Sequence, residues 1–279
     1  MNPIDFFTDA FGSDLTQRAL LGGLLAAATT ALVGTWVVVR GLAFLGDALA
    51  HGLLPGIAVA AVWGFDLSIG ALLSAALMIG GVNLVNRTTR LSNDTAIGLL
   101  FVAMLAIGVI IISREPTYAG DLTSFLFGDV LGVSAADLWL SATVLAVTVV
   151  AMLVGHRSFL ALAIDPAKAM TLRLRPGLAH AALLTLLAFS VVASFRAVGT
   201  LLVFGLLVAP PATAVLIVRR LPVAMVVAVL LGWLAVVLGL AISYHAETAA
   251  SATVAGVAVA QFFVVLAVTE ARSRLRRAV

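Results

Sequence analysis

Long apolar stretches follow one another along almost the whole chain, and they constrain its fold more than any other feature. They span residues 19–39, 42–63, 67–86, 95–113, 136–155, 178–195, 198–218, 222–243 and 252–269. Runs of about 18 or more apolar residues predict transmembrane helices, because a helix of that length crosses the hydrocarbon core. Only 10% of the 279 residues are charged, against about a quarter in a soluble domain. The sequence therefore predicts an all-α integral membrane protein, a polytopic helical bundle with residues 1–279 as one domain.

The loops between these stretches alternate in charge. Basic loops lie at residues 87–90, 156–175, 219–220 and 272–277, whereas Asp66 and Glu247 are among the acids of the other loops. Because cytoplasmic loops are enriched in Lys and Arg, the basic loops and the C-terminus are expected in the cytoplasm. The pI near 10.2 then reflects topology and not a nucleic-acid partner. Nine crossings with an external N-terminus satisfy this alternation, and eight are the alternative if one segment is re-entrant.

Three irregularities interrupt the predicted helices. Pro55-Gly56 is expected to bend or break the second segment, and Pro210-Pro211 removes two adjacent N–H donors from the middle of the seventh. Such breaks are tolerated in a membrane where the backbone is buried in protein or lines a cavity. Residues 121–129 are too short to cross and are flanked by carboxylates. We expect them to form a short external re-entrant or interfacial helix.

Asp47 and His51 lie inside the second apolar segment. A charged side chain at membrane depth costs on the order of 3 kcal/mol, so it usually serves a function. Their spacing of four residues puts both side chains on one helix face. Carboxylate oxygen and imidazole nitrogen suit Mn²⁺, Fe²⁺ or Zn²⁺. Two ligands are few, but a symmetric dimer with this helix at its axis would supply four. The alternative is a buried polar pair that fixes helix packing.

Three other charged or titratable residues lie at predicted external helix ends. His245 and Glu247 would guide or gate a cation, or else are solvated loop residues. Arg196 lies in a predicted tight turn, where it would either repel cations or pair with a neighbouring acid. His156 and His180 lie at predicted cytoplasmic helix ends. The sequence assigns these two histidines no role.

The longest cytoplasmic loop is predicted at residues 156–177. Asp165-Pro166 there forms an N-cap followed by proline at the first helical position, which predicts a short helix. This helix would dock a partner, or it is an ordinary interfacial helix. The chain's one lysine, Lys168, follows Ala167, so a Walker A loop cannot form. Common hydrolase motifs and cysteine are also absent from the sequence. If transport is driven by ATP, the ATPase is therefore another polypeptide.

Five sequence blocks, in order, resemble the ABC-3 metal permease family, the permease subunits of bacterial ABC transporters for manganese, zinc and iron. The blocks are GDALAHGLLPGIAVA at 46–60, DTAIGLLF at 94–101, SFLFGDVLGVSAADL at 124–138, IDPAKAM at 164–170 and AVGTLLVFGLLVAPPATA at 197–214. The chain departs from the family near the last external loop. Family members often carry a Pro-Thr-Gly-type turn there, whereas this chain reads HAETAASATVAG.

The resemblance implies a homo- or heterodimer of permeases in the bacterial cell membrane, cytoplasmic ATPase subunits and an extracytoplasmic metal-binding protein. It implies that Asp47 and His51 match the family's in-membrane metal ligands. It also implies a cytoplasmic coupling helix that contacts the ATPase. The residues of that segment are Ile164, Asp165, Pro166, Ala167, Lys168, Ala169 and Met170. A divalent transition metal would be the transported substrate, and no permanently bound cofactor is expected.

The sequence thus predicts a permease that imports a divalent transition metal and depends on a separate ATPase. One alternative is a proton- or sodium-coupled secondary transporter that uses the Asp/His pair as a proton relay. Another is a vitamin B12 or siderophore permease, which has no need of this pair. A membrane enzyme or a structural scaffold is disfavoured, because the common catalytic motifs are missing. The sequence does not select among Mn²⁺, Zn²⁺ and Fe²⁺.

Overall fold

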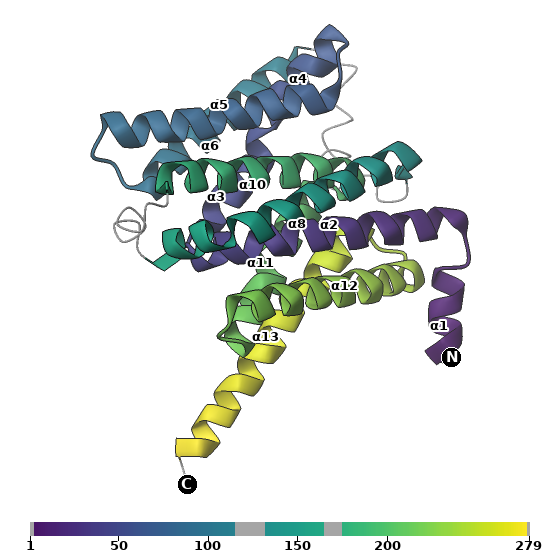
Figure 1. The fold of residues 1–279 in the computed structure, drawn as a ribbon. Coiled ribbons are helices and arrows are strands. Elements are labelled where there is room, and N and C mark those ends of the chain that lie inside the picture. Colours follow the sequence, from purple (N-terminus) through teal and green to yellow (C-terminus); the bar gives the residue numbers. More distant parts are fainter. Residues whose placement is uncertain (1–2, 115–131, 165–174, 278–279) are drawn as a thin grey trace.

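The computed structural model describes residues 3–114, 132–164 and 175–277, and these residues fold almost entirely into helices (Figure 1). The helices are α1 (Pro3–Ala10), α2 (Asp14–Val39), α3 (Ala43–Gly52), α4 (Leu54–Trp63), α5 (Leu67–Thr88), α6 (Asn93–Ser113), α8 (Ala135–Ile164), α10 (Pro176–Val198), α11 (Thr200–Ile217), α12 (Leu221–Ala246) and α13 (Ala250–Arg277). Within the described ranges, nine helical stretches are long and apolar enough to cross a membrane, α3 and α4 together forming one. This confirms the predicted polytopic all-α fold.

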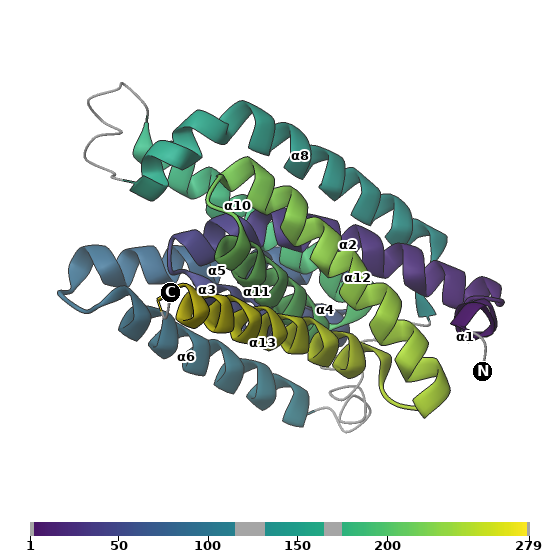
Figure 2. The ribbon, with the colours of Figure 1, turned by 90° about the horizontal axis from the view of Figure 1, so that it is seen from below.

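The helix α3 lies in the middle of the bundle, and this position decides what its side chains can contact. On one side it packs against α5 and α6, and on the other against α2, α10 and α11. Figure 1 shows α4, α5 and α6 stacked on one side of α2, α8 and α10, with α11, α12 and α13 on the other side. Figure 2 shows α11 enclosed by α10, α12 and α13. The outward faces of α5, α6, α8 and α13 carry exposed apolar side chains, as expected for contact with lipid or another subunit.

Polar side chains fix where several helices begin. The Ser13 hydroxyl accepts the Thr16 N–H at the start of α2, and the Ser92 hydroxyl accepts the Thr95 N–H at the start of α6. Asp66 accepts N–H groups from the first turn of α5. Such caps satisfy N–H groups that have no partner within a helix. They set the borders of α2, α5 and α6 at or just outside the apolar stretches.

The predicted break at Pro55-Gly56 is confirmed, and α5 supplies the groups that repair it. The helix ends at Gly52 and resumes at Leu54. The Gly56 N–H donates to Ser74 Oγ over 3.2 Å, and this hydroxyl donates to the Gly52 carbonyl over 2.8 Å. One hydroxyl therefore stands between the two backbone groups that an unbroken helix would join directly. A Cβ on Gly56 would overlap the Gly70 carbonyl of α5, so glycine is needed for this close approach.

The predicted interruption at Pro210-Pro211 is wrong. The helix α11 runs from Thr200 to Ile217 with both prolines inside it. Pro211 deprives the Leu207 carbonyl of its helical donor, and this carbonyl lies against Gly34 of α2, where any Cβ would overlap it. Close packing on α2 therefore holds the segment helical although two backbone N–H groups are missing.

Two other predicted boundaries are also corrected. The segment expected to end at residue 155 continues as α8 to Ile164, so the first part of the predicted loop 156–177 is helical. Arg196 lies in the last helical turn of α10, and the turn to α11 is formed by Gly199, which has a φ of 77°. The predicted external helix at 121–129 and residues 165–170 of the predicted coupling segment lie outside the described residues.

Candidate metal site at the broken helix

Asp47 and His51 lie one helical turn apart on α3, just before the break. Asp47 Oδ1 and His51 Nε2 are 3.7 Å apart, and each side chain is 30% exposed. Two ligand atoms that bind one tetrahedral ion at about 2.1 Å lie about 3.4 Å from each other. The pair is therefore already close to the separation that a shared divalent ion requires.

Packing around the pair closes one side and leaves another open. The His51 ring meets the ring of Phe101 on α6 edge to face, with centroids 5.7 Å apart. The neighbouring α3 residues Leu45, Ala48 and Leu49 are buried in the core. Asp47 and His51 thus lie along the border of the packed face. A carboxylate that is partly open within a membrane span must be met by water, by an ion or by another subunit.

The break adds a favourable electrostatic term for a cation. The last turn of α3 ends at Gly52, and the Leu53 N–H turns back to the His51 carbonyl. Pro55 cannot supply the N–H that would otherwise reach this carbonyl. The C-terminal end of a helix carries partial negative charge, and broken membrane helices use such ends to bind cations. The imidazole of His51 is therefore held where a cation is stabilised by the helix end as well.

One chain supplies an incomplete ligand set. Among the residues that the structure describes, no group of three or more His, Cys, Asp and Glu side chains lies close enough to hold a metal ion. Asp47 and His51 therefore provide two side-chain ligands and no third of these types. Further ligands would have to be water, amide or carbonyl oxygens, or residues of a second subunit.

The predicted gate residues do not lie on α3. His245 lies in the last turn of α12, where its Nε2 donates to the Phe6 carbonyl over 2.9 Å and its ring stacks on the Phe6 ring with centroids 4.2 Å apart. This contact joins α1 to α12, a relation that no sequence pattern indicated. Glu247 caps α12 with a left-handed φ of 50° and is exposed. Arg196 belongs to α10. A role in gating stays a prediction for all three residues.

Ile164 is the last residue of α8. The remaining predicted coupling residues, Asp165 to Met170, lie outside the described part of the chain. Their predicted role in coupling therefore stays a prediction.

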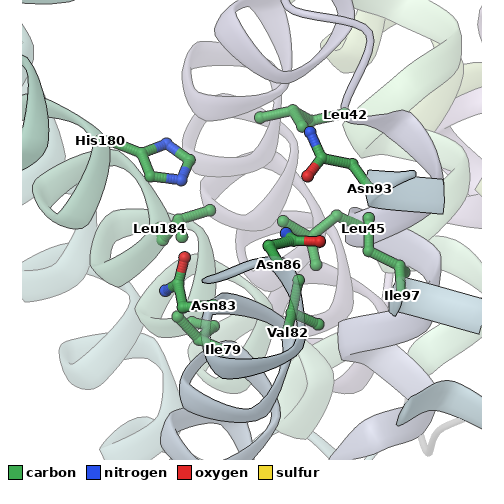
Figure 3. Close-up of a pocket in the computed structure, with 10 residues that line it drawn as sticks. All are labelled: Leu42, Leu45, Ile79, Val82, Asn83, Asn86, Asn93, Ile97, His180 and Leu184. Carbon is green, nitrogen blue, oxygen red and sulfur yellow. The ribbon is translucent and has the colours of Figure 1, made fainter. Parts of the chain in front are cut away.

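Sequence reasoning missed a polar cavity of about 40 Å³ next to the first turn of α3 (Figure 3). Asn83 and Asn86 of α5, Asn93 of α6 and His180 of α10 contribute its polar groups. The His180 Nδ1 lies 3.0 Å from Arg40 Nη1, in the turn that leads into α3. Partial burial lowers the pKa of Arg40 from its usual value. The Asn-x-x-Asn spacing in an apolar segment was the signal that could have pointed to this cavity.

A central broken helix, an acid and an imidazole at its end, and nine potential spans in the described part of the chain define a polytopic membrane transport protein. The chain belongs to the ABC 3 transport family, whose model matches residues 13–269. It is accordingly the membrane permease subunit of an ABC import system and is not itself the ATPase.

Individual relatives agree over most of the chain. A manganese transport system membrane protein of Listeria monocytogenes is 32% identical over 89% of this chain and 88% of its own length. A chelated iron transport system membrane protein of Yersinia pestis is 33% identical over 92% of this chain and 86% of its own. The solved structure of PsaBC from Streptococcus pneumoniae in complex with a Fab has a TM-score of 0.85 at 28% identity, covering 94% of this chain and 95% of that one.

Proposed function

We propose that the chain forms the translocation pathway for a divalent transition-metal ion and that Asp47 and His51 hold this ion within the membrane. The observation that carries the proposal is the carboxylate–imidazole pair, 3.7 Å apart and partly open, at the end of a broken central helix. The names of the relatives refer to manganese and to chelated iron. Zn²⁺ takes the same ligand types. The ion is the transported substrate, and no permanent cofactor is proposed.

A second permease subunit would complete the site. The pair lies on the border of the packed face of α3, with 30% of each side chain open. Two copies that meet along this border would supply two carboxylates and two imidazoles. These four ligands equal the coordination number of most protein zinc sites. Mn²⁺ and Fe²⁺ accept the same ligands with added water. The second subunit is either another copy of this chain or a different permease that carries the same pair.

The remaining partners follow from the class of transporter. Two cytoplasmic ATPase subunits would contact the segment Ile164–Met170, and an extracytoplasmic metal-binding protein would deliver the ion on the opposite side. The arginine-rich helix ends, such as the end of α5 with Arg87 and the following Arg90, and the end of α13, would face the cytoplasm of a bacterial cell. The ends that hold Arg196, His245 and Glu247 would then face outward, where these residues could control entry.

The break between α3 and α4 provides a hinge for the proposed transport cycle. The ion would displace any proton from His51, because only the neutral imidazole binds metal. Closure of the ATPases would move the coupling segment, and α3 would tilt relative to α4 about Leu53. Tilting would separate the paired ligands of the two subunits and release the ion inward.

Elemental analysis of cells that lack this chain tests the proposal. Complementation with wild type should restore one transition metal, whereas Asp47→Asn or His51→Ala at matched expression should not. The control is Gln261→Leu, a polar-to-apolar change on α13, which should behave as wild type. Restoration by the Asp47 and His51 variants would show that the pair is a packing feature. If a variant with both Asp47→Asn and His51→Ala still imported an iron chelate, a siderophore-type permease would be favoured instead.

A further inference from the structure

The polar cavity beside α3 contains a hydrogen-bond acceptor that is left without a partner. The Oδ1 atom of Asn86 is buried and accepts no hydrogen bond from the described residues. A buried amide oxygen without a partner costs about 1–3 kcal/mol, which an occupant of the cavity would relieve. Asn83 and Asn93 bring two more amides to the same space (Figure 3). Three asparagines around one cavity call for an occupant that interacts with amide oxygens, either water or a cation.

His180 contributes a donor to this cavity and not a metal ligand. A guanidinium can only donate hydrogen bonds, so the contact between Arg40 Nη1 and His180 Nδ1 makes Nδ1 the acceptor. The proton of the neutral ring is then on Nε2, which can donate to water. Arg40 also places a fixed positive charge behind the imidazole. The cavity therefore combines neutral amide oxygens with a nearby cation, and it would hold a divalent ion only weakly.

The cavity lies at the start of α3, on the side of the Asp47/His51 pair that is away from the break. Leu45 of α3 lines the cavity and precedes Asp47 by two residues, which is about 3 Å of helix rise but about 200° around the helix, so α3 turns different faces to the cavity and to the pair. On α6, Asn93 and Ile97 line the cavity, and Phe101, one further turn along, contacts the His51 ring. The connection between the cavity and the metal pair therefore runs along one face of α6. Arg87 and Arg90 follow Asn86 at the end of α5.

We propose that Asn83, Asn86 and Asn93 form an exit station for the transported divalent cation. In this station an ion released by Asp47 and His51 binds amide oxygens while water replaces its protein ligands. A volume of about 40 Å³ accommodates an ion with very few waters, because one water needs roughly 10–15 Å³. Weak binding suits this step, since an ion in transit must leave again. The inference rests on the proposed function and adds residues to its pathway.

The absence of cysteine from the sequence allows a direct test. In the assembled transporter, Asn86→Cys would be the only thiol of the permease, and it can be labelled from the arginine-rich side with methanethiosulfonate ethylammonium. We expect labelling that Cd²⁺ slows several-fold. Thr88→Cys, exposed at the end of α5, should be labelled with no effect of Cd²⁺. Gln261→Cys, at a buried amide of α13, should not be labelled.

Failure to label Asn86→Cys, or labelling that Cd²⁺ does not slow, would overturn the exit station. Transport provides the second measurement. Asn86→Leu should lower the maximal rate of Mn²⁺ uptake several-fold while equilibrium binding of Mn²⁺ stays at the wild-type value. Normal uptake by Asn86→Leu, with uptake abolished in His51→Ala, would remove the exit station and leave the proposed function intact. Normal uptake by both variants would remove the proposed function itself.

Discussion

Two proline-containing regions of the bundle differ in whether the helix continues through the proline. At Pro55 the chain breaks into α3 and α4, whereas α11 continues through Pro210 and Pro211. Each proline removes a backbone donor, so loss of the donor alone does not decide whether a helix breaks. What differs is the neighbouring helix. At the break, the Ser74 hydroxyl of α5 accepts from the Gly56 N–H and donates to the Gly52 carbonyl. At Pro211, α2 presents the bare backbone of Gly34 to the free carbonyl.

The difference matters because it separates a chemical region, where groups that can bind a cation surround α3, from a structural region, where the prolines of α11 serve packing alone. The break places the end of α3 beside His51, one turn from the Asp47 carboxylate, and a polar cavity lies at the other end of the same short helix. Around the α11 prolines, Leu206, Leu207 and Ala209 are buried in apolar packing. Irregular backbone in a membrane helix therefore indicates function only where polar groups gather beside it.

The largest effect is expected from Gly34→Ala. The added Cβ would overlap the Leu207 carbonyl, and both groups belong to backbones that cannot move independently. We expect a loss of about 3 kcal/mol, at the upper end for overpacking, measured by unfolding in mixed detergent micelles. Gly80→Ala is the matched control, because a Cβ there meets no atom within 4 Å. It should be neutral or stabilising by up to about 1 kcal/mol. Equal stability of the two variants would refute the close α2–α11 contact.

Ser74→Ala tests the other region and should have the next largest effect. It leaves the Gly56 N–H and the Gly52 carbonyl without their shared partner, which should lower the free energy of unfolding by about 1–3 kcal/mol. Ser190→Ala is the control, because that hydroxyl is fully buried and has no partner among the described residues. A Ser74 variant as stable as the control would mean that the backbone groups of α3 and α4 bond directly and that Ser74 does not define the break.

The sequence predicted the elements that depend on local pattern. Apolar length located the spans, and the spacing of Asp47 and His51 placed both on one helix face, as the distance of 3.7 Å now shows. Pro55 predicted the break correctly because its effect lies within its own segment. The end of α8 was predicted too early, because hydropathy falls at His156 and Arg157 although the helix continues. The end of an apolar run marks a change of environment and not the end of a helix.

Features that depend on contacts between distant segments could not be predicted. The continuity of α11 rests on Gly34, which lies far away in the sequence. The polar cavity combines Asn86, Asn93 and His180 from three helices, and no single segment shows that these residues meet. The contact between His245 and Phe6 is of the same kind. In the contacts of Gly34 and of Phe6 one partner gives no sequence signal, since a glycine or a carbonyl has no distinctive side chain.

Acidification should weaken metal binding at the broken region and leave the α11 region unaffected. A proton on His51 occupies the nitrogen that binds the ion, so protonation of this imidazole lowers the affinity, to be measured over a range from about pH 7.5 to about pH 5.5. Once the imidazole is protonated, each further pH unit costs about tenfold in affinity, or about 1.4 kcal/mol, for each histidine that binds. Equilibrium binding of Mn²⁺ to the purified transporter measures this. Constant affinity across the range would show that His51 is not a ligand.

The smallest change in stability is expected from replacing the prolines themselves. Metal uptake, in contrast, should differ between the two replacements. Pro211→Ala restores a donor to the Leu207 carbonyl but removes the ring atoms that pack near Gly34. These effects oppose each other, so stability should change by no more than about 1 kcal/mol, with uptake near wild type. Pro55→Ala should change stability as little, because its new N–H can bond the His51 carbonyl. That bond would extend α3 through the break and make the hinge beside the metal pair more rigid, so uptake should fall several-fold. If Pro211→Ala reduced metal uptake as much as Pro55→Ala, both prolines would be parts of the transport mechanism, and the distinction between a chemical and a structural region would fail.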